Sequence, residues 1–280
     1  MTFESVGIIS PGAMGAAVGQ TLVRSKKVLV ALEGRSQATR ARASAAGLSD
    51  VGDVASLVDA SELVLSIAPP GSAIKIAGEV AQAMDASGKT PLFVDANAVS
   101  PARATQIRRM ISKAGAAYVD GGIVGGPPRG GARTDLFVSG AGAEALAQEL
   151  SCDELVVSFL GDDPTAASAL KMCFAAWTKG TAALLIAIRA VATRDGVDSA
   201  LAALWERVQP NALAGSQGAG MVASRAWRWV DEMREISRTF EDAGLDGGAA
   251  MAAANLYSRL TGFKDHDRPV SLPELLEAIG

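Results

Sequence analysis

The chain has 280 residues, of which 49% are hydrophobic and 20% charged, and its formal net charge is −4. This length suffices for one large or two medium globular domains, and the charge balance argues against binding to nucleic acid or to an anionic membrane. The two cysteines, Cys152 and Cys173, and the single histidine, His266, provide neither a disulfide framework nor a histidine-rich metal site. His266 lies in a polar stretch, which also argues against a Ser-His-Asp triad.

Targeting signals are not expected. The N-terminus has no basic segment followed by an apolar one, so we predict no signal peptide. The longest apolar run, residues 181–188, is shorter than the ~20 residues of a membrane helix. A cytoplasmic protein that binds neither a metal nor a membrane is the prediction.

Short apolar segments alternate with amphipathic ones through the first 160 residues. Strands are expected at residues 6–10, 28–32, 63–68, 92–95, 117–119 and 136–139, with helices at 13–25, 38–46, 72–85 and 101–114. Nearly continuous aliphatic strands separated by helices are typical of a parallel sheet covered on both faces. Residues 1–161 are therefore predicted to form an α/β domain, a Rossmann-type doubly wound parallel sheet.

The pattern changes after Gly161, where strand signals end. An alanine-rich segment from Pro164 to about Arg194 predicts a long central helix of the kind that is buried, often against a second subunit. Further helices are expected at residues 199–207, 224–243, 248–260 and 272–278. Residues 162–280 are thus predicted to form an all-helical domain for substrate binding and dimerisation.

A glycine-containing turn follows the first predicted strand, where residues 7–15 read Gly-Ile-Ile-Ser-Pro-Gly-Ala-Met-Gly. Backbone N–H groups at such a helix N-terminus bind a pyrophosphate, which the helix dipole also favours. Ser10 replaces the first glycine of the G-x-G-x-x-G fingerprint, whereas Gly12 and Gly15 are retained. An ordinary strand-to-helix turn is the alternative. The predicted dinucleotide-binding residues here are Ser10, Pro11, Gly12, Ala13, Met14 and Gly15.

The end of the second strand selects the cofactor. An acidic residue there binds the ribose hydroxyls of NAD, whereas arginine accommodates the 2′-phosphate of NADP. Arg35, Ser36 and Arg40 would form a phosphate pocket, so NADP is the predicted cofactor. NAD stays possible, because Glu33 would reach the ribose if the strand ended one position later.

The order of these motifs resembles that of the β-hydroxyacid dehydrogenase superfamily, which includes 3-hydroxyisobutyrate and 6-phosphogluconate dehydrogenases and, more distantly, imine reductases. The C-terminal half resembles the branch with a phosphogluconate-dehydrogenase-like C-terminal domain. In this superfamily an apolar-proline step after a strand passes beside the cofactor, and a serine in a D-x-S-T segment lies near the nicotinamide ribose. The resemblance assigns these roles to Ala68, Pro69, Pro70 and Asn97. An Asx turn or helix cap before Pro101 is an equally good explanation of Asn97.

Residues 120–126 resemble the superfamily's substrate-binding segment D-A-P-V-S-G-G. Gly125 and Gly126 are retained, and their backbone amides would approach a substrate carboxylate. Val124 replaces the serine, which removes a hydroxyl donor and suggests a less polar substrate group beside Ile123 and Val124. A purely structural glycine loop is the alternative.

Lys171 stands on the predicted central helix at the position of the superfamily's proton-transfer lysine, while Ala175 replaces the asparagine of the next turn. A lysine among apolar residues is expected to have a lowered pKa and to exchange a proton near neutral pH, although a snorkelling lysine is the alternative. Lys179 is either a substrate anchor or a surface residue. Trp229, Glu232 and Met233 line either a substrate pocket or the core. Arg234-Glu235 stands about where the superfamily has a Lys-Asp pair.

Together these features predict an NADP(H)-dependent homodimer that interconverts a hydroxyl and a carbonyl on a small 3-hydroxyacid-like molecule, with Lys171 as acid/base. An NADPH-dependent imine reductase is one alternative. A cofactor-binding protein that has lost catalysis is another, because Ser10, Val124 and Ala175 depart from the superfamily pattern.

Overall fold

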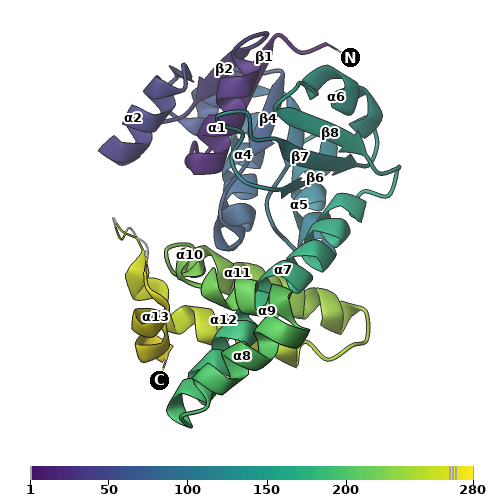
Figure 1. Ribbon diagram of the computed structural model, residues 1–280. Coiled ribbons are helices and arrows are strands. Elements are labelled where there is room, and N and C mark those ends of the chain that lie inside the picture. Colours follow the sequence, from purple (N-terminus) through teal and green to yellow (C-terminus); the bar gives the residue numbers. More distant parts are fainter. Residues whose placement is uncertain (1, 265, 267, 269, 280) are drawn as a thin grey trace. The chain divides into compact units, whose positions relative to one another are not determined.

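The computed structural model describes residues 2–264, 266, 268 and 270–279 (Figure 1). It divides the chain into two compact units, Met1–Lys171 and Met172–Gly280. The domain boundary expected after residue 161 stays a prediction.

The first unit is built on a single sheet of eight strands in the order β3-β2-β1-β4-β5-β6-β7-β8. All neighbouring strands run parallel except β6 and β7, which are antiparallel and joined by a loop, residues 125–133. The predicted doubly wound sheet is confirmed, although its last two strands run opposite to the rest. The strands are β1 (Ser5–Ile9), β2 (Lys27–Val30), β3 (Ser49–Asp50), β4 (Leu63–Ser66), β5 (Leu92–Asp95), β6 (Tyr118–Val124), β7 (Thr134–Ser139) and β8 (Leu155–Phe159).

Helices cover both faces of this sheet because successive strand residues point to opposite sides. Val28 and Val30 enter one apolar cluster with α1, α2 and α6. Leu29 enters the other, with α3, α4 and α5. The helices are α1 (Ala13–Leu22), α2 (Gln37–Ala45), α3 (Val54–Ala60), α4 (Ala73–Ser87), α5 (Pro101–Lys113) and α6 (Ala143–Leu150), with a 3₁₀ turn η1 (Pro70–Ser72).

The second unit is helical throughout its described residues. Its main core lies between α11 and α12, where Met233 and Ile236 are buried together with Ala253 and Tyr257. Its elements are the greater part of α7 (Ala166–Arg194), then α8 (Asp198–Val208), α9 (Pro210–Gln217), α10 (Gly220–Ala223), α11 (Ala226–Asp242), α12 (Gly248–Arg259), η2 (Thr261–Phe263) and α13 (Leu272–Ile279).

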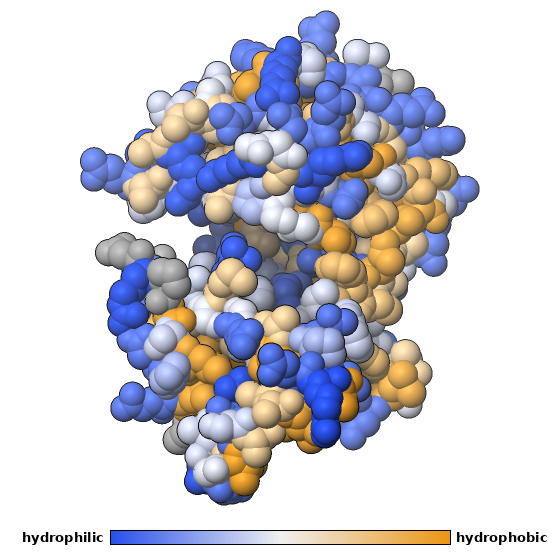
Figure 2. Space-filling view, viewed as in Figure 1, coloured by the Kyte–Doolittle hydropathy of each residue, from blue (hydrophilic) through white to orange (hydrophobic). Residues whose placement is uncertain are grey.

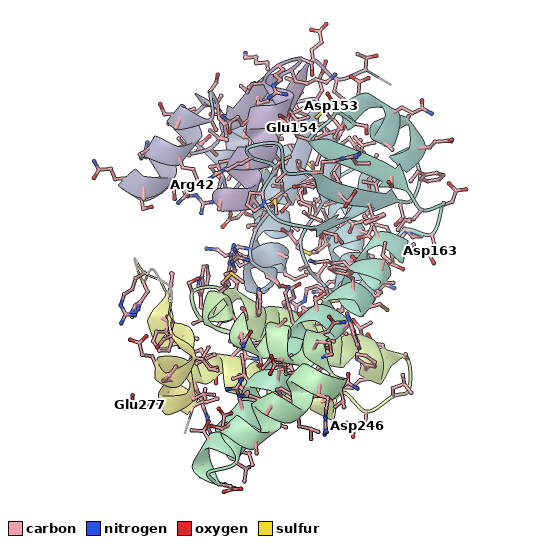
Figure 3. All side chains as sticks on the ribbon, in the orientation of Figure 1. Arg42, Asp153, Glu154, Asp163, Asp246 and Glu277 are labelled. Atoms are coloured by element: carbon pink, nitrogen blue, oxygen red, sulfur yellow. The ribbon has the colours of Figure 1, made fainter. Side chains whose placement is uncertain are left out.

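Helix α7 begins in the first unit and continues into the second. Asp163, which is labelled in Figure 3, accepts hydrogen bonds from the backbone N–H and hydroxyl of Thr165, both at 2.9 Å, just before the helix begins. Helix α7 is long and apolar enough to cross a membrane, but the core helices of soluble proteins can have the same length and composition.

Large apolar side chains of α7 are exposed instead of buried. Phe174, Trp177, Leu184 and Val191 recur at intervals of three and seven residues, and Trp177 is 74% exposed. This spacing places them along one side of the helix. Hydrophobic residues also reach the surface of each unit in Figure 2. Cys152 and Cys173 are exposed, free thiols.

Candidate functional site

The turn between β1 and α1 is strained at Ser10. Among the described residues Ser10 is the one non-glycine residue with a positive φ, +61°. This conformation favours glycine, and glycine is what the dinucleotide fingerprint has at this position. The backbone therefore adopts the shape of the complete fingerprint although the side chain does not match it.

The two retained glycines do different things. A Cβ on Gly15 would lie 3.0 Å from the carbonyl oxygen of Ser10, so Gly15 lets the helix pack closely against the turn. A Cβ on Gly12 would have only the Ser10 oxygen within 4 Å, at 3.9 Å, and would project into open space. Gly12 supplies no side-chain cap to α1, whose first turn contains no acidic residue. The first amides of α1 thus have no side-chain cap and are available to an anion such as a pyrophosphate. Pro11 is buried, Met14 packs on the core and Ala13 is exposed.

The predicted phosphate pocket after β2 is only partly available. Arg35 is exposed, and its Nη2 donates to Ser10 Oγ at 3.4 Å. Ser36 caps α2 by accepting from the Thr39 amide. Arg40 donates to the Leu32 carbonyl at 2.5 Å and pairs with Asp50 at 3.6 Å, so its guanidinium supports the loop. A cavity of about 320 Å³ adjoins this region, and its lining includes Glu33 and Arg40.

Asn97 connects the ends of β4 and β5. Its Oδ1 accepts from the Ala68 amide at 2.6 Å, and its Nδ2 donates to Ser66 Oγ at 2.9 Å and to Asp95 at 2.5 Å. The side chain is 2% exposed. Asn97 therefore fixes the start of the segment in which Pro69 is exposed and Pro70 is buried.

Two buried carboxyl groups, which the sequence did not single out, lie on neighbouring strands. Asp95 of β5 pairs in register with Asp120 of β6. Burial, together with the charge of Asp120, raises the pKa of Asp95 to about 7. Burial raises the pKa of Asp120 to about 6, although hydrogen bonds from Ser168 oppose this shift. Asp120 accepts from the Ser168 amide at 2.7 Å and from its hydroxyl at 2.6 Å, so it caps the first turn of α7.

Lys171 lies on α7 one turn beyond that cap and is half-buried. A Cβ on Gly122 of β6 would be 3.0 Å from Lys171 Cβ, so this part of α7 packs directly on the strand. Ile123 is buried and Val124 half-buried at the end of the same strand. Gly125, with φ +105°, and Gly126 begin the exposed loop that follows. The structure thus brings Lys171 and the predicted substrate segment together in the first unit.

The other predicted substrate residues belong to the second unit. Lys179 forms an ion pair with Glu232, and both side chains are nearly buried. The Lys179 ammonium also lies 5.3 Å from the ring centroid of Trp229, which packs edge-on against Tyr257. Lys179 is therefore not a surface residue. These residues form a packed cluster, and their assignment to the substrate stays a prediction.

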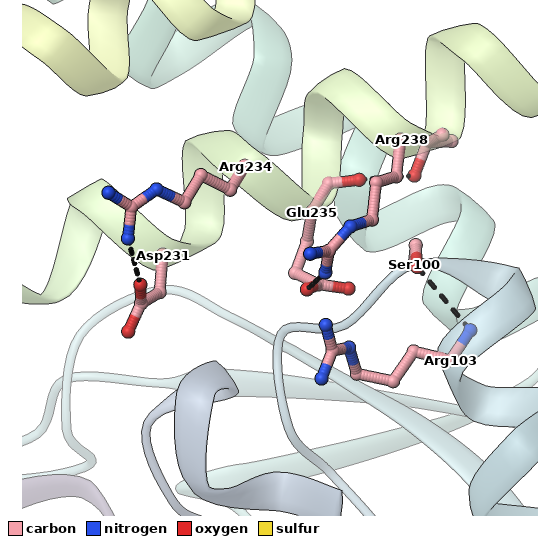
Figure 4. Close-up of polar contacts among 7 residues, drawn as sticks. Ser100, Arg103, Asp231, Arg234, Glu235 and Arg238 are labelled. Carbon is pink, nitrogen blue, oxygen red and sulfur yellow. Dashed lines mark hydrogen bonds and ion pairs between the residues drawn. The ribbon is translucent and has the colours of Figure 1, made fainter.

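Arg234 and Glu235 take part in separate ion pairs along α11. Arg234 Nη1 lies 2.9 Å from Asp231, and Arg238 Nη1 lies 2.5 Å from Glu235 (Figure 4). Figure 4 also shows the cap of α5 in the first unit, where the Arg103 amide donates to Ser100 Oγ.

The chain matches known families over most of its length. Residues 5–152 match the NAD binding domain of 6-phosphogluconate dehydrogenase. Residues 192–260 match a domain of unknown function, DUF1932. An uncharacterized protein of Methanothermus fervidus is 27% identical over 204 residues, which are 73% of this chain and 77% of that protein.

Solved structures share the fold. A conserved protein of unknown function, described as similar to 3-hydroxyacid dehydrogenases, is 26% identical with a TM-score of 0.67 and covers 92% of this chain and 97% of its own. The Mycobacterium tuberculosis 3-hydroxyisobutyrate dehydrogenase with L-serine is 15% identical with a TM-score of 0.72, covering 100% and 99%. The Aspergillus terreus reductive aminase with NADPH and ethyl-5-oxohexanoate is 18% identical with a TM-score of 0.58, covering 100% and 99%.

Proposed function

Because the chain belongs to the family of the NAD-binding domain of 6-phosphogluconate dehydrogenase, we propose that it is an NADP(H)-dependent oxidoreductase acting on a small 3-hydroxyacid-like substrate. The resemblance to β-hydroxyacid dehydrogenases is confirmed by this match and by the shared fold. One observation carries the proposal: Lys171 packs against β6 in the same unit as the glycine turn. In such sheets ligands bind at the carboxyl ends of the parallel strands.

The proposed chemistry is the interconversion of a hydroxyl and a carbonyl. The nicotinamide cofactor, when bound, supplies hydride transfer. The α1 amides near Gly12 hold its pyrophosphate, and Asn97 shapes the strand-end loop beside it. Lys171 Nζ takes the proton from the substrate hydroxyl during oxidation and returns it during reduction. Ile123 and Val124 provide an apolar wall, and the amides of Gly125 and Gly126 bind the substrate carboxylate.

NADP is the proposed cofactor because an exposed guanidinium, that of Arg35, lies beside the turn. Arg40 contributes less than the sequence suggested, since it is bonded to the Leu32 carbonyl and to Asp50. Glu33 is exposed and is the feature that would favour NAD. Calorimetric dissociation constants for NADPH and NADH test the choice, and tighter binding of NADH would reject it.

The activity is tested by following NADPH absorbance at 340 nm with purified protein and a panel of 3-oxoacids, simple ketones and cyclic imines, and NADP⁺ reduction with 3-hydroxyacids. Turnover of the oxoacids and hydroxyacids supports the proposal. Turnover confined to imines would establish the imine reductase alternative, which the shared fold with a reductive aminase also permits. Tight cofactor binding without turnover of any compound would indicate a protein that has lost catalysis.

We further propose a cytoplasmic homodimer in which the exposed apolar side of α7 packs on a second copy. Phe174, Trp177, Leu184 and Val191 are exposed along one side of the helix, and exposed apolar residues grouped in this way mark interfaces. Light scattering coupled to size exclusion measures the mass. A dimer that Trp177→Asp converts to a monomer is expected, and a monomeric native protein would refute the assembly.

A further inference from the structure

Arg129, in the loop between β6 and β7, lies beside the first turn of α1. We infer that Arg129 is a cofactor-binding residue that contacts the pyrophosphate from this loop. The inference rests on the proposed function, because it extends the dinucleotide site formed by the glycine turn. Its position in the sequence gives no hint of this role, since 116 residues separate it from the helix that it contacts.

The contact is direct. Arg129 Nη2 donates to the carbonyl oxygen of Ala13 at 3.4 Å, and Ala13 is the first residue of α1. Because a helix rises only ~1.5 Å per residue, this carbonyl lies within one turn of the amides that receive a phosphate. A hydrogen bond of 3.4 Å to a neutral carbonyl is weak. A phosphate oxygen at the helix N-terminus offers the same guanidinium a stronger, charge-assisted bond.

The loop holds Arg129 in place at its base. The Arg129 carbonyl accepts from the Ala132 amide at 3.0 Å. Gly130 and Gly131, between them, have φ values of +59° and +84°, so the four residues form a type I′ turn. Thr134 Oγ1 donates to the Gly126 carbonyl and closes the loop below this turn. These hydrogen bonds fix the backbone of the loop, while the exposed Arg129 side chain remains able to move from the Ala13 carbonyl to a ligand.

The electrostatics of the turn favour an anion. The first turn of α1 has no acidic side chain, and its cap, Gly12, offers no side-chain acceptor. A second guanidinium, that of Arg35, reaches Ser10 Oγ of the same turn at 3.4 Å. One arginine therefore lies at Ser10 and another at the first residue of α1, so positive charge flanks the helix N-terminus that would receive the pyrophosphate.

The two arginines should differ in what they recognise. Arg35 follows β2, where the ribose of the adenosine half is read, and it is proposed for the 2′-phosphate. Arg129 is proposed for the pyrophosphate, which NADPH, NADH and ADP-ribose all carry. Removing Arg129 should therefore weaken the binding of all three ligands by similar factors, whereas removing Arg35 should weaken the binding of NADPH selectively.

Titration calorimetry on the full chain tests this assignment with NADPH, ADP-ribose and 2′-AMP, which lacks a pyrophosphate. Arg129→Ala is expected to weaken NADPH and ADP-ribose about 10- to 100-fold, the effect of losing one charge-assisted hydrogen bond, and to leave 2′-AMP unchanged. Arg129→Lys should give dissociation constants between those of the native protein and of Arg129→Ala, because lysine keeps the positive charge but cannot donate two parallel hydrogen bonds.

Arg133→Ala is the matched control, because it removes the same charge from an exposed position of the same loop. It should change the dissociation constants less than about twofold, as expected for a charge outside the contact. Equal losses in Arg129→Ala and Arg133→Ala, or an equal loss for 2′-AMP, would overturn the inference while leaving the proposed function intact. Failure of the native protein to bind any dinucleotide would overturn both. Circular dichroism verifies that each variant is folded.

Discussion

Gly122 and Lys171 are in contact across the junction of β6 and α7. A Cβ on Gly122 would stand 3.0 Å from Lys171 Cβ and 2.7 Å from the carbonyl oxygen of Ala167. Both atoms are fixed by α7, and the Ala167 oxygen belongs to its backbone, so neither can move aside without a shift of the helix. The absence of a side chain at Gly122 therefore sets the distance between the proposed acid/base and the strand that carries the substrate segment.

Gly122→Ala should move the start of α7 and destabilise the first unit by about 1–3 kcal/mol, the usual cost of overpacking. Urea denaturation measures the loss. Gly180→Ala, on the same helix, is the control, since a Cβ there meets nothing within 4 Å. The control should be neutral or gain up to about 1 kcal/mol from helix propensity. Equal stability of the two variants would show that the close contact is unimportant.

Lys171→Met keeps the length of the side chain and removes its proton. Turnover should fall about 10²- to 10⁴-fold, the contribution of a positioned acid/base, while the dissociation constant of NADPH stays within about twofold because the glycine turn is untouched. Steady-state kinetics and calorimetry measure the two quantities. Turnover near that of the native enzyme would remove Lys171 from the mechanism.

Ser10→Gly should stabilise the protein. A residue other than glycine at φ +61° costs about 1 kcal/mol, and this gain exceeds the loss of the long contact with Arg35. Thermal denaturation should therefore give a higher Tm than for the native protein. Ser10→Ala, which keeps the strain and loses the same hydroxyl, should not raise the Tm, and a rise in both variants would show that strain is not the cause.

Arg189 anchors the second unit through a bidentate pair with Asp198, in which Nη2 lies 2.7 Å from Oδ2, and through Ser216 Oγ at 3.0 Å. Arg189→Met leaves the Asp198 carboxylate without this partner and should cost about 3 kcal/mol. Arg194→Met breaks an exposed pair with Asp195 and should cost far less, because solvent screens exposed charges. Chemical denaturation compares the two, and similar losses would contradict the importance of burial.

The buried carboxyl groups predict a pH dependence of stability. The pKa of Asp95 rises from 3.8 to about 7 on folding, and that of Asp120 rises from 3.8 to about 6. The folded state therefore binds more protons than the unfolded state between these values, so this contribution is complete below about pH 4 and is lost as pH rises toward 7. Asp95→Asn removes the ionisation of Asp95.

The free energy of unfolding of Asp95→Asn, relative to the native protein, should therefore increase between pH 4 and pH 7. Denaturation at several pH values measures the difference. Asp59→Asn, on an exposed site, is the control and should give a constant difference over that range. A constant difference for Asp95→Asn would show that the carboxyl group ionises in the folded protein as it does in the unfolded chain.

Local sequence patterns predicted the elements whose signals are local. Residues 92–95 were expected as a strand and form β5, and most helices lie within a few residues of their predicted bounds. Strand β8 and helices α3 and α6 were not expected, although their own sequences carry local signals. Other exceptions depend on distant contacts. Gly121 and Gly122 read as a loop, yet β6 continues to Val124 because these glycines admit close neighbours from β5 and α7. The reversed direction of β7 and β8 follows from the loop after β6, and neither strand direction nor the two-residue β3 has a local signature.

The residues of the candidate site also divide into those that local motifs indicate and those that depend on the folded structure. The glycine turn, Asn97 and Lys171 were singled out from the sequence because each stands at a recognisable place in an ordered set of motifs, and their roles stay predictions. Asp95 and Asp120 were not, because an aspartate at the end of a strand looks the same whether the fold buries it or not. The available signal was that Asp95 ends one expected strand, residues 92–95, and Asp120 directly follows another, residues 117–119. Arg129 had no signal in the sequence, since its contact with Ala13 joins residues that are 116 positions apart.

Each unit carries one exposed free thiol, Cys152 in the first and Cys173 in the second. The native chain is therefore suited to paired spin labelling without any engineered cysteine. Electron–electron resonance between labels on these two thiols would give the distance distribution between the loop before β8 and the start of α7, with and without NADPH. A distribution that narrows on adding the cofactor would show that its binding restricts the motion of α7 relative to the sheet.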